Sequence, residues 1–591
     1  MSAGQEVAGQ HTGLPRHVPG LVLLRHYRKS WLRPDLVAGV ILAAVLVPQG
    51  MAYAELAGLP TVTGLYTTVV CLVGYAIMGP SRILVLGPDS AISPMILAAT
   101  LPLIGASGDP ATAIALAGML ALLVGAIEIG LGVARLGFVA DLLSKEVQVG
   151  YMNGLAIIII VSQLPKLCGF STSAQGFVDQ VRAFGAGLHQ TNRVTLLLGL
   201  STLVVILVLP RVSGRLPAIL VAIVGATAVS AVFDLASRGV AVVGALPKGI
   251  PAPAVPWTKP ADVLPLVIAA VGITLVSLTD TIATSTSFAA RRGEEVSPDQ
   301  EMIGVGTANI AAGLFQGFAV SSSASRTAVA EQSGAKSQVT GLVGAGTVVM
   351  LLLFLSSLLA DLPQTALAAV VIAAASSLVD VAVLRRYWTV RRSAVLLSVV
   401  ASASVILLGV LEGIVVAIGL SILLFFRRSW WPHGEVLGRA PDGGWHAVRD
   451  QNKGRQVPGV VVFRWEAPLF FANVGIFRRQ VRSLARDESV EWIVLQCEAV
   501  TDIDVTAADM LEQLSTQLRA QGVHLAFVEV RARLSEDMHH YGLFRTVHRE
   551  RLYPSVNAAV EAISELGPPE GTPAPEPRKP AAEPGEEERD S

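Results

Sequence analysis

Long apolar stretches fill the chain up to about residue 430, and charged positions return at ordinary density after that point. A helix that crosses a bilayer needs about 20 mostly apolar residues. Two apolar stretches, 88–103 and 321–334, are too short to cross unaided and open with Gly, Pro or Ser clusters. Twelve longer ones are 35–57, 62–79, 112–134, 145–167, 195–210, 217–233, 263–288, 299–317, 338–360, 363–380, 393–408 and 412–427. We therefore expect a polytopic α-helical membrane domain of fourteen elements over 31–432, after an N-terminal segment, 1–30.

The two short stretches occupy the third place in each half of seven elements. Because seven is odd, the second half runs through the bilayer in the opposite orientation to the first. Interrupted helices at matching places are typical of inverted-repeat transporters, whose binding site lies where the half-helices meet. The pattern therefore predicts repeat one over about 35–233 and repeat two over about 263–427.

The residues around the short stretches favour a negatively charged ligand. Gly87 and Pro88 are expected to begin the first helix, since proline suits the first helical turn. Serines are expected to open the second helix, since serine favours the N-cap. Facing helix starts would present unpaired N–H groups and positive dipole ends to an anion. The expected substrate-binding residues here are Gly87, Pro88, Ser90, Ser321, Ser322, Ser323, Ser325 and Arg326.

Arg326 adds a fixed positive charge, and an arginine at membrane depth is costly and usually functional. Gln49 and Tyr53, four residues apart in the first span, could line the same cavity. Two alternatives stay open. Gly, Pro and Ser could merely ease tight helix packing, and Arg326 could pair with a carboxylate or reach the cytoplasmic surface.

Asp280 and Thr284 lie in an apolar span and share one helix face, because they are four residues apart. A carboxylate with a nearby hydroxyl suits Na⁺, which takes hard oxygen ligands much as Ca²⁺ does. A carboxylate in a low-dielectric site could instead bind and release a proton. The pair is therefore the candidate site for a coupling ion, Na⁺ or H⁺, and the alternative is a structural partner for Arg326. We expect no other cofactor or metal, since the three cysteines fit no metal spacing.

Lys and Arg residues in the short loops predict the topology. With the N-terminus inside, every inside loop carries them, as the positive-inside rule requires. The N-terminus also lacks the apolar core of a signal peptide. We therefore expect a multi-pass protein of the plasma (inner) membrane with both termini in the cytoplasm.

The C-terminal quarter has the pattern of a separate cytoplasmic domain. A polar linker is expected over 433–457 and an α/β domain over 458–565, because strand and helix patterns alternate along the latter. The sequence holds no Gly-rich phosphate-binding loop and no DNA-binding segment, so a nucleic-acid partner is not expected. Residues 566–591 are rich in Pro, Glu and Ala and are expected to form a disordered tail.

Four runs of the sequence resemble the sulfate-permease (SulP) family of anion transporters. They are PQGMAYAELAGLPTVTGLY, GPSRILVLGPDSAIS, SKEVQVGYMNGLAIIIIVSQLPKLCGF and DQEMIGVGTANIAAGLFQGFAVSSSASRTAVAEQSGAKS, in the family order. The resemblance implies fourteen spans in two inverted repeats, a core unit that moves against a gate unit, and a homodimer. It also implies that the anion is held at Gln49, Tyr53, Gly87, Pro88, Ser90 and the run from Ser321 to Arg326.

The same resemblance places Asp280 where members carry an acidic residue, often Glu, and some bicarbonate carriers use a pair like Asp280 and Thr284 for Na⁺. The run FAVSSSASR departs from the Pro-Val-Thr-Gly-type start of many relatives, which leaves the exact anion open. The C-terminal domain resembles the STAS domain that ends most members. Thr506 matches a phosphorylatable position of soluble relatives and is a candidate regulatory residue, with a helix N-cap as the alternative.

These features favour a secondary active transporter of small anions with elevator-type alternating access. Sulfate is the first expectation, and bicarbonate and dicarboxylates stay open. The alternatives are an uncoupled anion channel and an anion sensor that signals to a cytoplasmic protein partner through the STAS domain. A nucleobase transporter would lack the second domain and would not favour Arg326, and an enzyme is disfavoured because no nucleophile–base set stands out.

Overall fold

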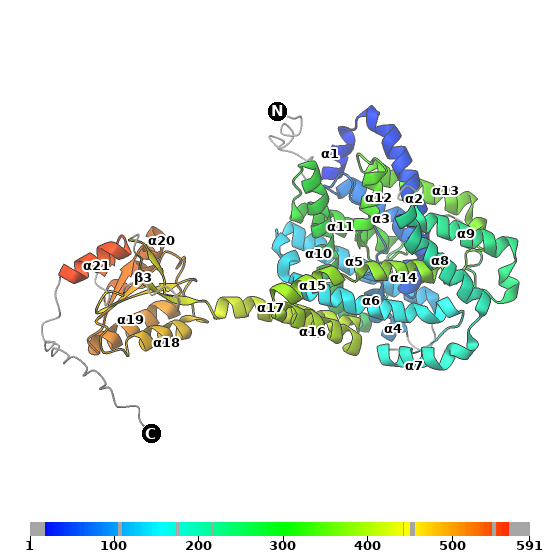
Figure 1. The fold of residues 1–591 in the computed structure, drawn as a ribbon. Coiled ribbons are helices and arrows are strands. Elements are labelled where there is room, and N and C mark those ends of the chain that lie inside the picture. The colour runs from blue at the N-terminus through cyan, green and yellow to red at the C-terminus, as the bar shows by residue number, and fades with distance from the viewer. Residues whose placement is uncertain are drawn as a thin grey trace, which may run out of the picture. The chain divides into compact units, whose positions relative to one another are not determined.

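The computed structural model describes residues 18–104, 109–172, 174, 176–213, 217–247, 249–440, 443–448, 456–545 and 551–565. The chain divides into two compact units, Met1–Ile422 and Leu423–Ser591, and each is described by itself. The first is a helical bundle and the second contains a β-sheet covered by helices (Figure 1). Most of the predicted N-terminal segment and all of the predicted tail lie outside the described residues.

Each of the fourteen predicted membrane elements contains a helix. They are α2 (Leu32–Leu56), α3 (Thr61–Met78), α4 (Ser93–Ile104), α5 (Pro110–Val133), α6 (Lys145–Cys168), α8 (Arg193–Val212), α9 (Ala218–Val232), α10 (Pro260–Arg292), α11 (Pro298–Leu314), α12 (Ala324–Gln332), α13 (Val339–Phe354), α14 (Gln364–Leu378), α16 (Arg392–Leu408) and α17 (Val410–Trp430). Within the described residues, seven helices are both long and apolar enough to cross a membrane. Three short helices were not predicted: α1 (Pro19–Arg25), α7 (Phe177–Gly187) and α15 (Val381–Val390).

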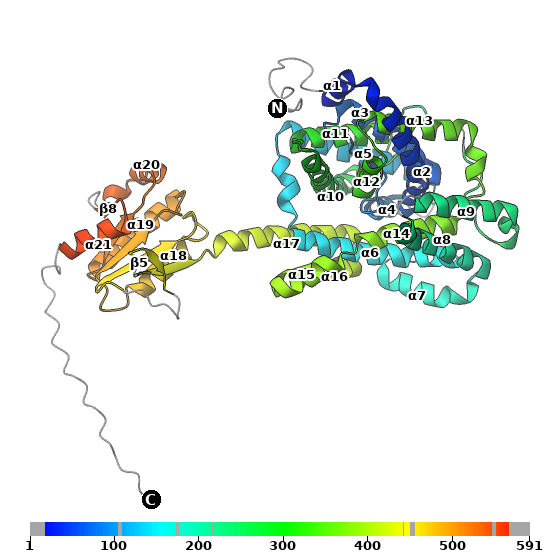
Figure 2. The ribbon, with the colours of Figure 1, turned by 45° about the horizontal axis from the view of Figure 1, so that its top comes forward.

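The two repeats are intertwined rather than stacked end to end. Helix α5 of repeat one packs along α11 of repeat two, and α2 and α3 pack against α13 (Figures 1 and 2). Glycines allow the closest of these approaches. A Cβ atom added to Gly125 would lie 2.5 Å from the carbonyl oxygen of Gly306, and one added to Gly313 would lie 2.6 Å from that of Gly118. Small residues at such contacts let helix backbones approach closely in a membrane.

The second unit contains a six-stranded sheet of order β4-β3-β5-β6-β7-β8, in which β5 to β8 run parallel and β3 and β4 form an antiparallel edge. The strands are β3 (Gly434–Arg439), β4 (Trp445–Ala447), β5 (Val460–Trp465), β6 (Trp492–Gln496), β7 (His524–Val528) and β8 (Leu552–Tyr553). Helices α18 (Val474–Leu484), α19 (Val505–Ala520) and α20 (Ala532–His540) share one apolar core with the sheet, and α21 (Val556–Glu565) shares the other. The alternation of strands and helices therefore builds the expected α/β domain.

In place of the polar linker expected over 433–457, the structure has the two edge strands β3 and β4. Strand β3 pairs with β5 and with β4, and of its residues only Leu437 and Gly438 are buried. Only β4 has an unpaired side among these two strands, because β3 is paired on both. The composition of this segment therefore resembles that of a linker, although its backbone completes the sheet.

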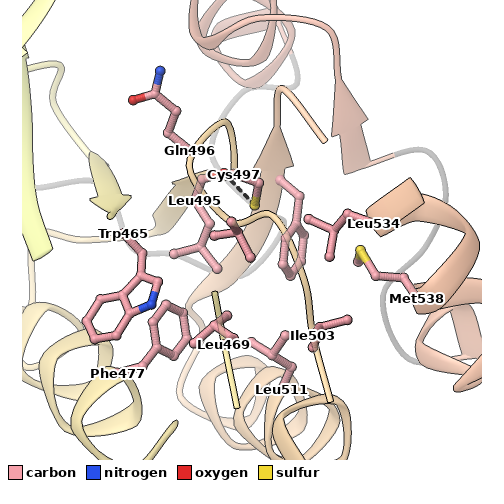
Figure 3. Close-up of a pocket in the computed structure, with 12 residues that line it drawn as sticks. Trp465, Leu469, Phe477, Leu495, Gln496, Cys497, Ile503, Leu511, Leu534 and Met538 are labelled. Atoms are coloured by element: carbon pink, nitrogen blue, oxygen red, sulfur yellow. Dashed lines mark hydrogen bonds between the residues drawn. The ribbon is translucent and has the colours of Figure 1, made fainter. Parts of the chain in front are cut away.

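A small cavity lies inside the second unit, among Trp465, Phe477, Leu495 and Cys497 (Figure 3). Its volume of about 20 Å³ exceeds the roughly 10–15 Å³ that a single water molecule needs. The rings of Trp465 and Phe477 pack edge to face with centroids 5.3 Å apart. Burial raises the pKa of Cys497 to about 12, so its thiol is unreactive at neutral pH. The cavity is a small packing gap in the apolar core of the second unit.

Candidate anion site

The two interrupted segments meet inside the membrane unit. Strand β1 (Leu86–Gly87) precedes α4, strand β2 (Ser321–Ser322) precedes α12, and the two strands pair antiparallel. The N–H of Ser323 donates to the carbonyl of Val85 over 3.2 Å, and the N–H of Val85 donates to Thr327 Oγ1 over 3.1 Å. Segments more than 230 residues apart in sequence are therefore joined in one small buried junction.

The first helix starts later than predicted. Gly87 is in β1 and Pro88 follows it, whereas α4 begins only at Ser93. Asp89 organises the turn between them: its Oδ2 accepts from the N–H of Ala91 at 2.8 Å, and its carbonyl accepts from the N–H of Ser93 at 3.1 Å. The expectation that Pro88 opens the helix is therefore wrong, because a turn closed by Asp89 separates Pro88 from α4.

The second helix also starts differently. Ser321 and Ser322 belong to β2, and α12 begins at Ala324 with Ser323 as its N-cap. The Oγ of Ser323 accepts from the N–H of Arg326 at 3.5 Å and lies 3.0 Å from the Oγ of Ser325. Of the four serines expected to open this helix, one caps it, one lies in its first turn and two extend the junction as strand.

Arg326 is 1% exposed and crosses to the other repeat. Its guanidinium donates to the carbonyl of Pro88 at 2.6 Å and to that of Gly87 at 3.4 Å, and its Nη2 lies 3.9 Å from Oδ1 of Asp89. Glycine at position 87 makes room for the arginine, since an added Cβ would lie 2.7 Å from Nη1 and would displace the guanidinium. The carboxylate that pairs with Arg326 is thus Asp89, and the alternative of a structural pairing with Asp280 is not what the structure shows.

Two buried donors at the junction have no partner within the described part of the chain: Nε of Arg326 and Oγ of Ser322. Both side chains are almost fully buried, with exposed fractions of 1% and 0%. An unpaired buried donor is costly, so such groups usually mark a place where a ligand, ion or water completes the bonding. Both residues lie within three positions of the start of α12, where the helix carries its positive dipole end.

The other predicted substrate residues are on α2 and in the turn before α4. Gln49 and Tyr53 are both buried on α2, and the Tyr53 hydroxyl lies near the buried Ser90 side chain. The structure therefore brings Tyr53 and Ser90 together. It places Gln49 one turn earlier on the same helix.

The predicted coupling residues lie on α10, which packs against β2. Asp280 is half-buried and lies within electrostatic range of Asp89, and Thr284 is buried one turn further on. The residue that touches the junction directly is Thr281, whose Oγ1 accepts from the N–H of Ser322 at 3.3 Å. No metal cluster of three or more His, Cys, Asp or Glu side chains occurs among the described residues.

The sequence analysis missed three buried side chains that shape the junction. Asp89 pairs with Arg326, while Glu128 and Asn309 hold the chain just before β2. A carboxylate inside an apolar helix was the available signal for Glu128, since such groups are rarely placed without a purpose. Asp89 directly follows the Gly-Pro pair, and the helix start predicted there concerned only the backbone.

Thr506 is exposed in the first turn of α19. The alternative of a Thr506 N-cap is wrong, because Asp504 caps the helix by accepting from the N–H of Ala507 at 2.8 Å. The hydroxyl of Thr506 is therefore open to modification in this geometry, and its regulatory role stays a prediction.

Comparisons with known proteins match both parts of the chain. The sequence profile of the sulfate permease family matches residues 32–401, and that of the STAS domain matches residues 453–559. A Mycobacterium tuberculosis (strain CDC 1551 / Oshkosh) protein named probable sulfate transporter is 41% identical over 548 residues, which cover 92% of this chain and 98% of that protein.

Two solved structures share the fold. The anion transporter murine Solute Carrier 26 family member A9, in its inward-facing state, matches with a TM-score of 0.86 at 25% identity over 94% of this chain and 96% of its own. The transmembrane domain of the cyanobacterium bicarbonate transporter BicA matches with a TM-score of 0.59 at 23% identity over 67% of this chain and 98% of its own. The predicted fold class, a polytopic helical membrane domain followed by an α/β STAS domain, is confirmed.

Proposed function

Since this chain belongs to the sulfate permease family, we propose that it is a secondary active transporter whose first substrate is sulfate. The family consists of transport proteins, so the expectation that the chain is not an enzyme is confirmed. The name of the Mycobacterium tuberculosis relative supports sulfate. Bicarbonate and dicarboxylates are the substrates to compare with it.

The proposal rests on the two unpartnered donors at the junction. Nε of Arg326 and Oγ of Ser322 are buried beside the start of α12, whose free N–H groups carry partial positive charge. A tetrahedral oxyanion has acceptors on every side and can take both donors together with a backbone N–H. The junction therefore has the donors that a desolvated oxyanion requires, and Tyr53 and Ser90 lie near it.

The coupling ion is proposed to bind at Asp280 and Thr284. Asp280 is on the helix that bonds Ser322 through Thr281, so a change of charge at Asp280 is transmitted to β2 through one residue. Either Na⁺ or a proton would neutralise the carboxylate and lower its repulsion of the anion. This is the physical basis for coupled uptake by alternating access.

Uptake of labelled sulfate by the purified full-length protein in proteoliposomes tests the proposal. We expect accumulation that a Na⁺ or H⁺ gradient increases, with bicarbonate and fumarate as competitors. Arg326→Ala should abolish uptake, whereas the exposed Arg182→Ala should leave it unchanged as a matched control. Absence of flux of any small anion would refute the function, and a steady uncoupled current in planar bilayers would favour a channel.

We further propose the orientation that the charges favour, with both termini in the cytoplasm of a plasma (inner) membrane protein that forms a homodimer. Arg385, Arg386, Arg391 and Arg392 are exposed around α15, where the cytoplasmic headgroups would lie. A protease added outside sealed cells should leave the STAS domain uncut. Cleavage from outside would indicate the opposite orientation, and a monomer in lipid nanodiscs would contradict the dimer.

A further inference from the structure

Three carboxylates of the membrane unit are fully buried and take no part in the proposed anion contacts: Asp35, Glu128 and Glu301. All three are held by neutral donors. Asp35 caps the start of α13 by accepting from Lys336, Ser337 and Thr340, and Glu301 accepts from Tyr75 and Ser81. Of the three, Glu128 is the one whose partners also bind the residue directly before β2.

The contacts of Glu128 run from α5 to the junction in two steps. Its Oε2 accepts from Nδ2 of Asn309 at 2.8 Å, and its Oε1 accepts from Oγ of Ser277 at 2.9 Å. The Asn309 amide then holds both backbone groups of Val320: Oδ1 accepts from the N–H at 2.7 Å, and Nδ2 donates to the carbonyl at 3.2 Å. Val320 is followed directly by Ser321 and Ser322.

Glu128 decides which way the Asn309 amide points. Its Oε2 accepts a hydrogen bond whether or not Oε1 carries a proton, so the asparagine turns its NH₂ group toward Oε2. This leaves Oδ1 facing the N–H of Val320, which is buried and has no other acceptor in the described part of the chain. If the amide turned over, two donors would face each other at Val320 and two acceptors at Glu128.

We propose that Glu128 is a positioning residue of the anion site: it orients Asn309, and Asn309 fixes Val320 so that Ser322 and Arg326 are presented to the anion. The inference rests on the proposed function and adds a residue on α5 to it. Glu128 does not touch the anion, so its effect passes through the strand.

Two substitutions distinguish the hydrogen bonds of Glu128 from its negative charge. Glu128→Gln can turn its carbonyl to Asn309 and its NH₂ to Ser277 Oγ, and so it keeps the asparagine in place. Glu128→Ala leaves the amide free to turn over and leaves buried groups unpaired. We expect Glu128→Ala to raise the KM for sulfate by about tenfold. Glu128→Gln should raise the KM much less.

The test measures KM and maximal rate of labelled sulfate uptake with the full-length protein in proteoliposomes. Asn309→Ala should raise KM as Glu128→Ala does, and the double variant should be no worse than Asn309→Ala alone, because both act through Val320. Asp35→Ala removes an equally buried carboxylate that contacts neither strand and should lower thermal stability without moving KM. Additive effects, a Gln variant as impaired as the Ala variant, or an equal KM rise in Asp35→Ala would overturn the proposal.

Hydrogen–deuterium exchange gives a readout that does not depend on transport. In Glu128→Ala, the amides of residues 318–322 should exchange faster than in the wild type, while Glu128→Gln should match it. A wild type that takes up no anion would remove the proposed function, and the exchange result would then still decide whether Glu128 holds the strand. Unchanged exchange in Glu128→Ala would refute the anchoring by itself.

Discussion

The two halves of the junction share a backbone plan and differ in polarity. The half from repeat one presents acceptors, the carbonyls of Gly87 and Pro88 and the carboxylate of Asp89. The half from repeat two presents donors, Ser322 and Arg326, together with the N-terminus of α12. The acceptors hold part of the guanidinium and leave its Nε free. Repeat one therefore holds the Arg326 guanidinium in place, and repeat two supplies the donors for the anion.

Helix placement follows the same division. In repeat two, α12 starts two residues after β2, so its free N–H groups lie close to the junction. In repeat one, α4 starts only at Ser93, after a turn closed by Asp89. Inverted repeats thus preserve the position of a broken helix without preserving its charge, and the repeat-two half is the one with an excess of positive potential.

Arg326→Ala should have the largest effect. It removes the guanidinium of the repeat-two half and leaves Asp89 of the repeat-one half without its partner. Breaking a buried pair by removing one partner costs about 3–5 kcal/mol, so we expect sulfate uptake to fall by about 100-fold or more. Arg326→Lys keeps the charge but not the planar fork and should be affected less. Uptake at the wild-type level in both variants would show that the arginine only supports the fold.

Asp280→Asn tests whether repeat two also contains the site of the coupling ion. The variant has no carboxylate that could bind a proton or neutralise Na⁺. Sulfate uptake should therefore lose its dependence on the driving gradient, while downhill exchange continues. Initial rates measured with and without Na⁺ and H⁺ gradients check this. An unchanged response to the gradient would move the coupling site elsewhere.

Ser322→Ala removes the uncharged donor of the repeat-two half. A neutral hydrogen bond is worth about 0.5–1.5 kcal/mol, so the KM for sulfate should rise by roughly three- to tenfold. Ser325→Ala is a matched control, since Ser325 is exposed and bonds the Ser323 side chain. A larger rise in Ser325→Ala than in Ser322→Ala would place the anion further along α12.

Asp89→Asn should have the smallest effect and the opposite sign. Asparagine can still accept from the N–H of Ala91, while the negative charge 3.9 Å from Arg326 disappears. The anion then meets an uncompensated guanidinium, and the KM for sulfate should fall by about threefold. A rise in KM would mean that Asp89 matters for the placement of Arg326 more than for its charge.

The fold was the part that the sequence could predict well. Apolar run length places all fourteen membrane helices, and Gly-Pro and serine clusters mark both interruptions, because these signals are local. The helix starts could not be predicted, since β1 and β2 form only by pairing with each other across the chain. The same limit explains β3, which is a strand because β5 lies beside it.

The candidate site was predictable residue by residue only where a side chain is unusual for a membrane. Arg326 stands out for this reason, and Asp280 does as well. Glu128 is equally unusual, but its contribution depends on Asn309 and Val320, which are ordinary residues until the structure brings them together. Asp89 was hidden because its partner is 237 residues away in the chain.

A structure of the full-length protein in lipid nanodiscs with bound sulfate tests the central claim most directly. We expect density for the tetrahedral anion at the start of α12, within hydrogen-bonding distance of Nε of Arg326 and Oγ of Ser322. Sulfate bound elsewhere, with both of these donors still unpaired, would contradict the assignment of the site to this junction.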